Sequence, residues 1–243
     1  MKSNKTPSIT VFYPFLNDWG TVGSLVALAA DTLEKITDDW EILIIDDGSE
    51  KDAQEALKAV VRLIKNTRII HHPKNLGYGA VLRTGFKNAK KELIFYTDGD
   101  AQYDPRELVE LLKKMELDNS RLGMVNGYKI KRSDPTHRVI AGQLYHYIVK
   151  FFFQLPIRDT DCDFRLLKKE VLNAITLKES SGTICVELVK TIDHAGYTIA
   201  EVPVHHYWRT SGKSQFFNFN RLFHTFIALI KLWIRLIIQK RYV

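Results

Sequence analysis

The chain has 243 residues, of which 45% are hydrophobic, and its 35 Lys and Arg outnumber its 28 Asp and Glu to give a formal net charge of +7. This length and apolar content suit one large α/β domain with a complete core and argue against a second full domain. The two cysteines are too few for a disulfide framework and lack metal-ligand spacing, and no secretory signal is recognised. We therefore expect a cytoplasmic protein.

Short β-rich runs alternate with longer helical patterns along the first half of the chain. We predict strands at 8–13, 41–46, 67–71, 92–97 and 122–129, and helices at 19–36, 51–65, 77–89 and 105–117. Asp104 as a cap and Pro105 at the first helical position mark the start of the last helix. This alternation predicts an α/β fold with a Rossmann-like, mostly parallel sheet flanked by helices on both faces.

The first candidate site lies directly after the strand at 92–97. Side chains alternate along a strand, so Asp98 and Asp100 point to the same side, and Gly99 lets a phosphate come close. Mg²⁺ or Mn²⁺ is usually held by one or two carboxylates together with substrate phosphates and water. We predict a metal site of Asp98, Asp100 and Gln102 that a nucleotide diphosphate completes. The alternative is a turn without a ligand, because Asp-Gly-Asp is common in turns.

A second acidic strand end precedes it in the chain. Asp46 and Asp47 follow a buried strand, and ligands of open α/β sheets bind at the carboxyl ends of the strands. Both are candidates for hydrogen bonds to the base or ribose of a nucleotide, and a turn cap is the alternative for one of them. Gly77 and Gly79 lie at a predicted helix start, where N–H groups and the helix dipole favour phosphate. The alternative is that these glycines only permit close packing of the helix.

The second half of the chain is less regular. Residues 136–154 are rich in aromatic and aliphatic side chains but are interrupted by His146 and Lys150. Acidic residues alternate at 159, 161 and 163, and we predict that they line the far wall of the crevice in which the nucleotide binds. A late strand at 196–204 is predicted to close the sheet. The pairs at 71–72 and 205–206 are adjacent histidines, which face opposite sides of a strand, so we expect surface or packing roles for them.

The C-terminal end of the chain is basic. From Val202 onward there is no Asp or Glu, and the seven Lys and Arg equal the whole net charge. Over 216–238 the apolar runs are too short to span a bilayer, but a narrow basic stripe that includes Lys231 and Arg235 is flanked by a broad apolar face. We predict an amphipathic helix at 216–243 on an anionic membrane surface, with these cations reaching the head groups. Packing on the protein's own sheet or on a second subunit is the alternative. Basic and aromatic residues are not interleaved on a polar face, so a nucleic-acid-binding module is disfavoured.

These motifs together resemble family 2 glycosyltransferases with the GT-A (nucleotide-diphospho-sugar transferase) fold, and most closely the polyprenyl-phosphate branch, similar to dolichol-phosphate mannose or glucose synthases. The resemblance is carried, in the expected order, by 14–18, 46–49, 75–80 with Gly85, 98–102, 159–165, 187–188, 201–204 and 209–214. It implies a catalytic domain at 1–215. It also implies metal-dependent, inverting transfer of a sugar from a UDP- or GDP-sugar to a polyprenyl phosphate at the cytoplasmic face of a membrane.

The resemblance also places donor residues near the nucleotide. Pro14, Asn17 and Asp18 stand in the family's donor motif, together with Asp46, Asp47, Gly77, Gly79 and Asp98. Leu16 and Asp18 replace the family's usual Tyr and Glu, which bears on which nucleotide is bound.

Acceptor chemistry divides the remaining candidates. A lipid phosphate arrives largely as an anion and needs cations, for which Arg132, Arg138, Arg209 and Lys213 are the candidates. By resemblance, Arg138, Arg209 and Ser214 fall in positions for acceptor or diphosphate contact. A hydroxyl acceptor would instead need a base, and Asp161 or Asp163 would serve. Asp100, Asp161, Asp163 and Arg209 are therefore the predicted catalytic residues.

Overall fold

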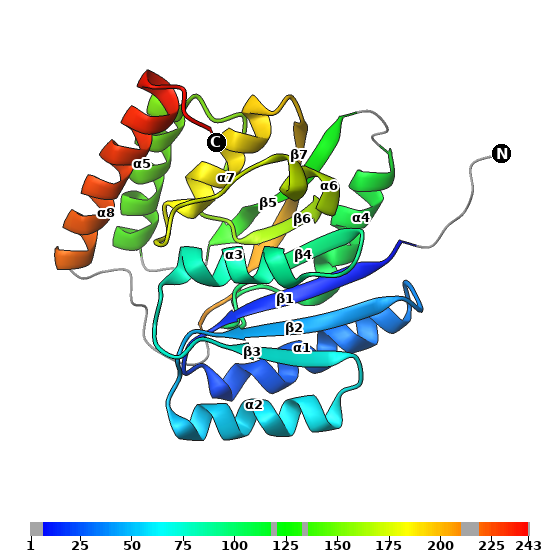
Figure 1. Ribbon diagram of the computed structural model, residues 1–243. Coiled ribbons are helices and arrows are strands. Elements are labelled where there is room, and N and C mark those ends of the chain that lie inside the picture. Colours follow the sequence, from blue (N-terminus) through cyan, green and yellow to red (C-terminus); the bar gives the residue numbers. More distant parts are fainter. Residues whose placement is uncertain (1–6, 118–120, 133–135, 210–218, 243) are drawn as a thin grey trace.

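The computed structural model describes residues 7–117, 121–132, 136–209 and 219–242, and the side chains of 7–115, 121–130, 142–209 and 223–242. Its strands form a single sheet, and the helices pack against that sheet (Figure 1). In chain order the elements are β1 (Ile9–Phe15), α1 (Trp19–Glu34), β2 (Trp40–Asp46), α2 (Lys51–Leu63), β3 (Thr67–His71), α3 (Tyr78–Asn88), β4 (Leu93–Thr97), the 3₁₀ turn η1 (Pro105–Glu107), α4 (Leu108–Leu117), β5 (Leu122–Arg132), α5 (Thr136–Phe153), β6 (Phe164–Lys168), α6 (Lys169–Ala174), α7 (Ile184–His194), β7 (Thr198–His206), α8 (Phe219–Trp233) and the π-helical turn η2 (Ile234–Ile238).

The seven strands are ordered β3-β2-β1-β4-β6-β5-β7. Neighbouring strands are parallel except at β6, which is antiparallel to both β4 and β5. The predicted mostly parallel sheet is confirmed, as are the five early strands and the late strand, which pairs with β5 at the edge of the sheet. The predicted helix start is also confirmed, because Asp104 Oδ1 accepts the N–H of Arg106 at 3.0 Å. No strand had been predicted at β6.

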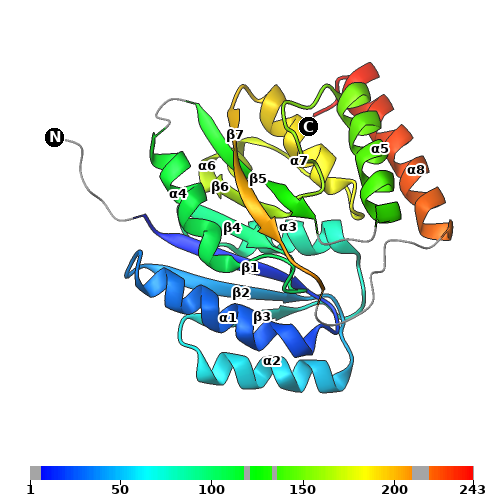
Figure 2. The ribbon, with the colours of Figure 1, turned by 180° about the vertical axis from the view of Figure 1, so that it is seen from behind.

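Two apolar clusters lie on the two faces of the sheet, because alternate strand residues point to opposite sides. Val11 and Tyr13 of β1 pack with α1, α2 and α4, which Figure 2 shows on one face. Phe12, between them, packs with α3 and α7 on the other face (Figure 1). The predicted cover of helices on both faces is therefore confirmed.

The last helix is part of this second cluster. Leu232 of α8 and Leu236 of η2 are completely or almost completely buried there, and Trp233 Nε1 donates to the Phe152 carbonyl of α5 at 3.0 Å. Figures 1 and 2 both show α5 and α8 side by side. The packing alternative thus holds for one side of the helix. Among the described residues, no helix is long and apolar enough to cross a bilayer.

The predicted head-group role is wrong for Arg235. Its guanidinium points inward, where it pairs with Glu187 of α7 and with Glu179. The helical wheel gave the angular spacing of the side chains but not which side of the helix packs. Arg235 lies next to the buried Leu236 and pairs with the buried Glu187. The last turn, η2, is π-helical, and Gln239 N donates to Ile234 O at 2.8 Å.

Candidate active site

Three adjacent parallel strands end at one edge of the sheet and bring the two acidic motifs together. β1 pairs with β2 on one side and with β4 on the other, and Phe15 at the end of β1 is in register with Asp46 at the end of β2. Asp98 follows directly after Thr97, the last residue of β4. The acids of both motifs therefore share the edge at which ligands of open α/β sheets bind.

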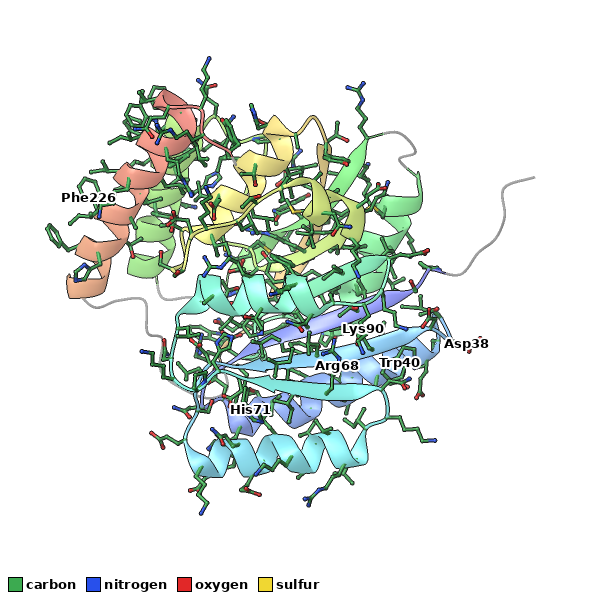
Figure 3. All side chains as sticks on the ribbon, in the orientation of Figure 1. Asp38, Trp40, Arg68, His71, Lys90 and Phe226 are labelled. Atoms are coloured by element: carbon green, nitrogen blue, oxygen red, sulfur yellow. The ribbon has the colours of Figure 1, made fainter. Side chains whose placement is uncertain are left out.

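Asp46 is completely buried at the end of β2 and is occupied by protein contacts. Its Oδ1 accepts the N–H of Ser49 at 3.0 Å, and its Oδ2 lies 2.7 Å from Nδ1 of His71. Figure 3 shows His71 at the matching end of β3. His71 therefore has the packing role expected of the 71–72 pair, and the donor role of Asp46 stays a prediction.

Asp47 holds the segment that leads into α3. Its Oδ1 accepts the N–H of Leu76 at 2.9 Å and its Oδ2 accepts the N–H of Gly77 at 3.0 Å. His72 lies between Asp47 and α3, with Nδ1 2.7 Å from Asp47 Oδ1 and Nε2 2.9 Å from Thr84 Oγ1. The turn cap given above as the alternative for one of the two aspartates is the contact of Asp46 with the Ser49 N–H, whereas Asp47 binds a distant segment.

The loop after β1 is fastened to its neighbours. Asn17 has a left-handed φ of 60° and its N–H donates to Ser49 Oγ at 3.0 Å. Thr21 Oγ1 donates to the Gly99 carbonyl at 2.7 Å, and a Cβ at Gly99 would lie 2.8 Å from the Pro14 carbonyl oxygen. The three loops thus form one packed rim around the strand ends. The donor roles of Pro14 and Asn17 stay predictions.

Four carboxylates influence one another beside this rim, and we call Asp18, Asp98, Asp100 and Asp163 the acidic cluster. Burial raises the pKa of Asp98 well above its usual value, and the charges of Asp163 and Asp100 raise it further. Burial likewise raises the pKa of Asp100, although Arg209 opposes the shift by donating to its Oδ2 at 2.5 Å. The pKa of Asp18 is also raised, mainly by burial and further by the charge of Asp100, against the opposing charge of Arg209. Burial and the neighbouring carboxylates therefore disfavour ionisation of the cluster, and Arg209 offsets this effect only in part.

This donor set fits a hard divalent cation. Oxygen ligands are what Mg²⁺ and Mn²⁺ prefer, and a cation between buried like charges would lower the cost of ionising them. Among the described residues, no three or more His, Cys, Asp or Glu side chains are grouped so that they alone would hold a metal ion. Such sites need only one or two carboxylates when substrate phosphates supply the other ligands. Asp98 and Asp100 are the residues that would contribute, and this assignment stays a prediction.

Gln102 has other contacts in this structure. Its side-chain Nε2 donates to the Tyr207 carbonyl at 3.1 Å, and the Tyr207 N–H returns a bond to the Gln102 carbonyl at 2.9 Å. Its backbone N–H donates to Asp100 Oδ1 at 3.0 Å. Gln102 therefore ties the turn after β4 to the end of β7, and its role as a metal ligand stays a prediction.

The glycines at the start of α3 pack closely against another loop. The Gly79 N–H donates to the Ser180 carbonyl at 2.9 Å, and the Gly77 N–H is bound by Asp47. A Cβ at Gly77 would lie 2.5 Å from the Ser180 carbonyl oxygen, and one at Gly79 would lie 2.5 Å from that of Glu179. The close packing offered as the alternative is present, and phosphate binding by these N–H groups stays a prediction.

The two candidate bases face different surroundings. Asp163 belongs to the acidic cluster, where its Oδ1 accepts a hydrogen bond from Cys185 Sγ at 3.1 Å. Asp161 instead lines a cavity of about 250 Å³ between β5 and α5, together with Lys129, His146 and Arg158. Of the two, Asp163 is the one that lies with Asp98.

The acceptor residues fall largely outside the described side chains. Arg132 lies at the end of β5 and Arg138 in the first turns of α5, where only the backbone is described. Lys213 and Ser214 lie outside the described residues. All four assignments stay predictions.

Two residues lie beneath the site, and sequence reasoning gave no role to one of them, Tyr78. The Tyr78 hydroxyl donates to Asp98 Oδ1 at 2.8 Å, and burial raises its pKa well above the usual value. The guanidinium of Arg165 is completely buried and donates to Asn126, Tyr96 and Thr160. Tyr78 directly follows Gly77 at the first position of a helix beside the strand ends, and this position was the available signal.

Comparison with known proteins identifies the family. Residues 10–176 match the model of Glycosyl transferase family 2. The chain belongs to this family. The resemblance stated from the motifs is thus confirmed.

Three relatives of this chain have names that denote sugar transfer or sugar-phosphate synthesis. The chain is 25% identical over 224 residues to dodecaprenyl-phosphate galacturonate synthase of Rhizobium johnstonii, covering 91% of this chain and 65% of that protein. It is 24% identical over 230 residues to undecaprenyl-phosphate 4-deoxy-4-formamido-L-arabinose transferase of Salmonella choleraesuis, covering 91% and 66%. Glycosyltransferase AglD of Haloferax volcanii is 24% identical over 213 residues, which is 85% of this chain and 34% of AglD. The chain spans from about a third to about two thirds of the length of these relatives.

Solved structures match over most of the sheet and helices. Glucosyl-3-phosphoglycerate synthase from Mycobacterium tuberculosis in complex with phosphoglyceric acid has a TM-score of 0.70 at 16% identity, covering 94% of this chain and 79% of that one. The same enzyme in complex with Mn²⁺ and UDP-glucose has a TM-score of 0.69 at 17% identity, covering 93% and 79%. This likeness confirms the GT-A fold.

Proposed function

We propose that this protein is a metal-dependent, inverting glycosyltransferase that moves a sugar from a UDP- or GDP-sugar to a polyprenyl phosphate at a membrane surface. The observation that carries the proposal is the acidic cluster with Arg209, which lies after β1 and β4 and directly before β6. Membership in family 2 supports sugar transfer, and the names of the Rhizobium and Salmonella relatives support a polyprenyl-phosphate acceptor.

The residues of the site suit departure of a nucleoside diphosphate. When bound at Asp98 and Asp100, a Mg²⁺ or Mn²⁺ ion would neutralise the charge that develops on the leaving diphosphate. Tyr78 fixes one oxygen of Asp98, and Arg209 holds one oxygen of Asp100. The fastened loops after β1, β2 and β4 would hold the nucleotide in one orientation, because each is bonded to its neighbour.

The donor proposal is tested with a panel of UDP- and GDP-sugars in the presence of Mn²⁺ or Mg²⁺. We expect metal-dependent hydrolysis or binding of one of them, and Asp100→Asn should lose it by two or more orders of magnitude, on the scale of removing one group that stabilises the leaving charge. Asp31→Asn, an exposed carboxylate on α1, is the matched control and should behave as the wild type. Absence of metal-dependent binding to every donor would refute the donor proposal.

The acceptor is tested by product analysis. With undecaprenyl phosphate we expect a sugar phosphodiester whose anomeric configuration is inverted relative to the donor. Transfer to a glycan hydroxyl and none to the lipid phosphate would instead assign a hydroxyl acceptor. In that case Asp163→Asn should reduce the rate by about 10²–10⁴-fold, the usual contribution of a general base.

An exposed apolar surface supports the membrane proposal. On α5, Phe151 is 78% exposed, and on the adjacent α8, Phe226 is 60% exposed and points away from the body of the protein in Figure 3. Lys231 of α8 is exposed next to Ile230, so the apolar surface has a cation beside it. This combination suits an anionic lipid surface. The exposed apolar side chains of this surface are Leu144, Tyr147, Ile148, Phe151, Phe152, Phe223, Phe226, Ile230, Ile234 and Ile238.

The membrane proposal is tested with vesicles that contain phosphatidylglycerol. The double variant Phe151→Ser, Phe226→Ser should bind them at least about tenfold more weakly, because burial of each phenyl ring contributes about 1.5–3 kcal/mol when complete. Leu63→Ser is the matched control, since Leu63 is 83% exposed on α2, away from this surface. Unchanged vesicle binding would refute the proposal, and so would concentration-dependent dimerisation that the double variant abolishes.

A further inference from the structure

The C-terminal helical segment contributes a charge to the interior of the protein. Ile234 and Ile238 of η2 are exposed, but Arg235 between them turns toward α7, with only 20% of its side chain exposed. It pairs with Glu187, which is 1% exposed, and with Oε1 of Glu179 at 3.1 Å. A buried carboxylate that loses its cation is costly, so this contact fixes η2 against α7.

Glu187 joins that contact to a neighbouring loop, residues 178–183. Its two carboxylate oxygens accept the backbone N–H groups of Lys178 at 3.0 Å and of Glu179 at 2.9 Å. Glu179 is held on its other side by Thr183, whose Oγ1 donates to Oε2 at 2.7 Å. The conformation of the 178–183 loop therefore depends on the group that balances Glu187.

The same loop lies directly on the start of α3. Arg83 of α3 donates to the Glu179 carbonyl at 2.9 Å, and the Gly79 N–H donates to the Ser180 carbonyl at 2.9 Å. There is no space for a side chain between them, because a Cβ at Gly79 would lie 2.5 Å from the Glu179 carbonyl oxygen. A displacement of the loop would therefore displace the first turn of α3.

The first turn of α3 reaches the acidic cluster. Tyr78, its first residue, donates its hydroxyl to Asp98 Oδ1 at 2.8 Å. Arg235 is thus connected to Asp98 through Glu187, the 178–183 loop and Tyr78, by contacts between residues far apart in the sequence.

We propose that Arg235 is a positioning residue for the donor site, so that the C-terminal helix completes the catalytic unit and is more than a membrane tether. This inference rests on the proposed function for the identity of the ligand. It also moves the functional boundary of the catalytic unit beyond residue 215, because Leu232 and Leu236 lie in the same apolar cluster as α7.

The test compares Arg235→Gln with Lys231→Gln, which removes an exposed cation from the same helical segment. Binding of UDP or GDP with Mn²⁺ is measured in lipid-free buffer, at a temperature where every variant is folded. We expect Arg235→Gln to bind the nucleotide about tenfold more weakly, Arg235→Lys to restore part of the affinity, and Lys231→Gln to stay within about twofold of the wild type. In vesicle binding the order should reverse, with Lys231→Gln the weaker variant.

Amide hydrogen exchange supplies a readout that needs no nucleotide. Arg235→Gln should speed exchange in the 178–183 loop and at Gly79, while the central strands stay protected. If Arg235→Gln does not fold, Glu179→Gln removes one of the two contacts and should give a smaller change of the same kind. Unchanged exchange at Gly79 in the variant that folds would overturn the inference. Failure of the wild type to bind any nucleotide would refute the proposed function instead, and the exchange result would still decide whether Arg235 positions α3.

Discussion

Replacement of Arg165 tests how much of the sheet depends on one buried cation. Its guanidinium is completely buried and donates to Asn126 Oδ1 at 2.7 Å, to the Tyr96 hydroxyl at 2.8 Å and to the Thr160 carbonyl at 2.7 Å. The nearest carboxylate oxygen recorded for it, Oδ1 of Asp163, lies 3.7 Å away. One side chain on β6 thus holds β4, β5 and the loop before β6.

The expected loss follows from these contacts. Each hydrogen bond to a charged group contributes about 1.5–3 kcal/mol, and removal of the charge returns part of its desolvation cost. Arg165→Met should therefore lower the free energy of unfolding by about 3–5 kcal/mol, and Arg165→Lys by less, because lysine keeps the charge but loses the fork of donors.

Urea unfolding followed by circular dichroism measures this loss. Arg158→Met is the matched control, because that side chain is 70% exposed and 3.7 Å from Glu201, so its removal should change stability by no more than about 1 kcal/mol. A loss below about 1 kcal/mol for Arg165→Met would refute the view that this guanidinium holds the strands together.

Two further predictions concern stability. Burial acts to raise the pKa of Glu41, but hydrogen bonds from Arg68, the Lys90 N–H and Thr10 outweigh it, so the pKa is lowered from 4.5. The stability that these contacts give is therefore present above pH 4.5 and is lost as the pH falls below it. Glu41→Gln should therefore flatten the decline in unfolding free energy between about pH 5 and pH 3, and an unaltered acid limb in urea titrations would contradict this. A Cβ at Gly85 would lie 2.5 Å from the Phe12 ring, so Gly85→Ala should cost about 1–3 kcal/mol even though alanine favours helix. Gly182→Ala, where a Cβ meets nothing within 4 Å, should be neutral or slightly stabilising, and equal unfolding midpoints for the two variants would show that the core yields around Phe12.

Local patterns accounted for the strands that carry the site. β1, β2 and β4 are apolar runs that end in acidic or turn residues, and each was placed within two residues of its position in the structure. The strand β6 was not predicted, because it directly follows the alternating acids at 159, 161 and 163, a segment that the sequence pattern assigned to the wall of the crevice. Arg165 of this strand is buried only because Asn126, Tyr96 and Thr160 supply oxygens from elsewhere in the chain.

The amphipathic pattern was sufficient to find the C-terminal helix but not its orientation. A wheel of 3.6 residues per turn placed Arg235 with Lys231 on one stripe, whereas in the structure Arg235 borders the buried side of the helix and pairs with the buried Glu187. The aromatic side chains of α5 gave no sequence signal of a membrane surface, because His146 and Lys150 interrupt them and their exposure depends on where α8 packs.

By itself the sequence determined the family, the parallel sheet and the edge at which the carboxylates lie, since alternation, turn residues and strand ends are local properties of the chain. The tertiary structure alone decided what those carboxylates contact: Asp47 fastens the start of α3, Tyr78 holds Asp98, and Arg209 pairs with Asp100. It also decided that Arg235 pairs with Glu187 of α7 and with Glu179. Hydrogen-bond partners of buried polar groups come from segments that are distant in sequence, and only packing brings them within reach.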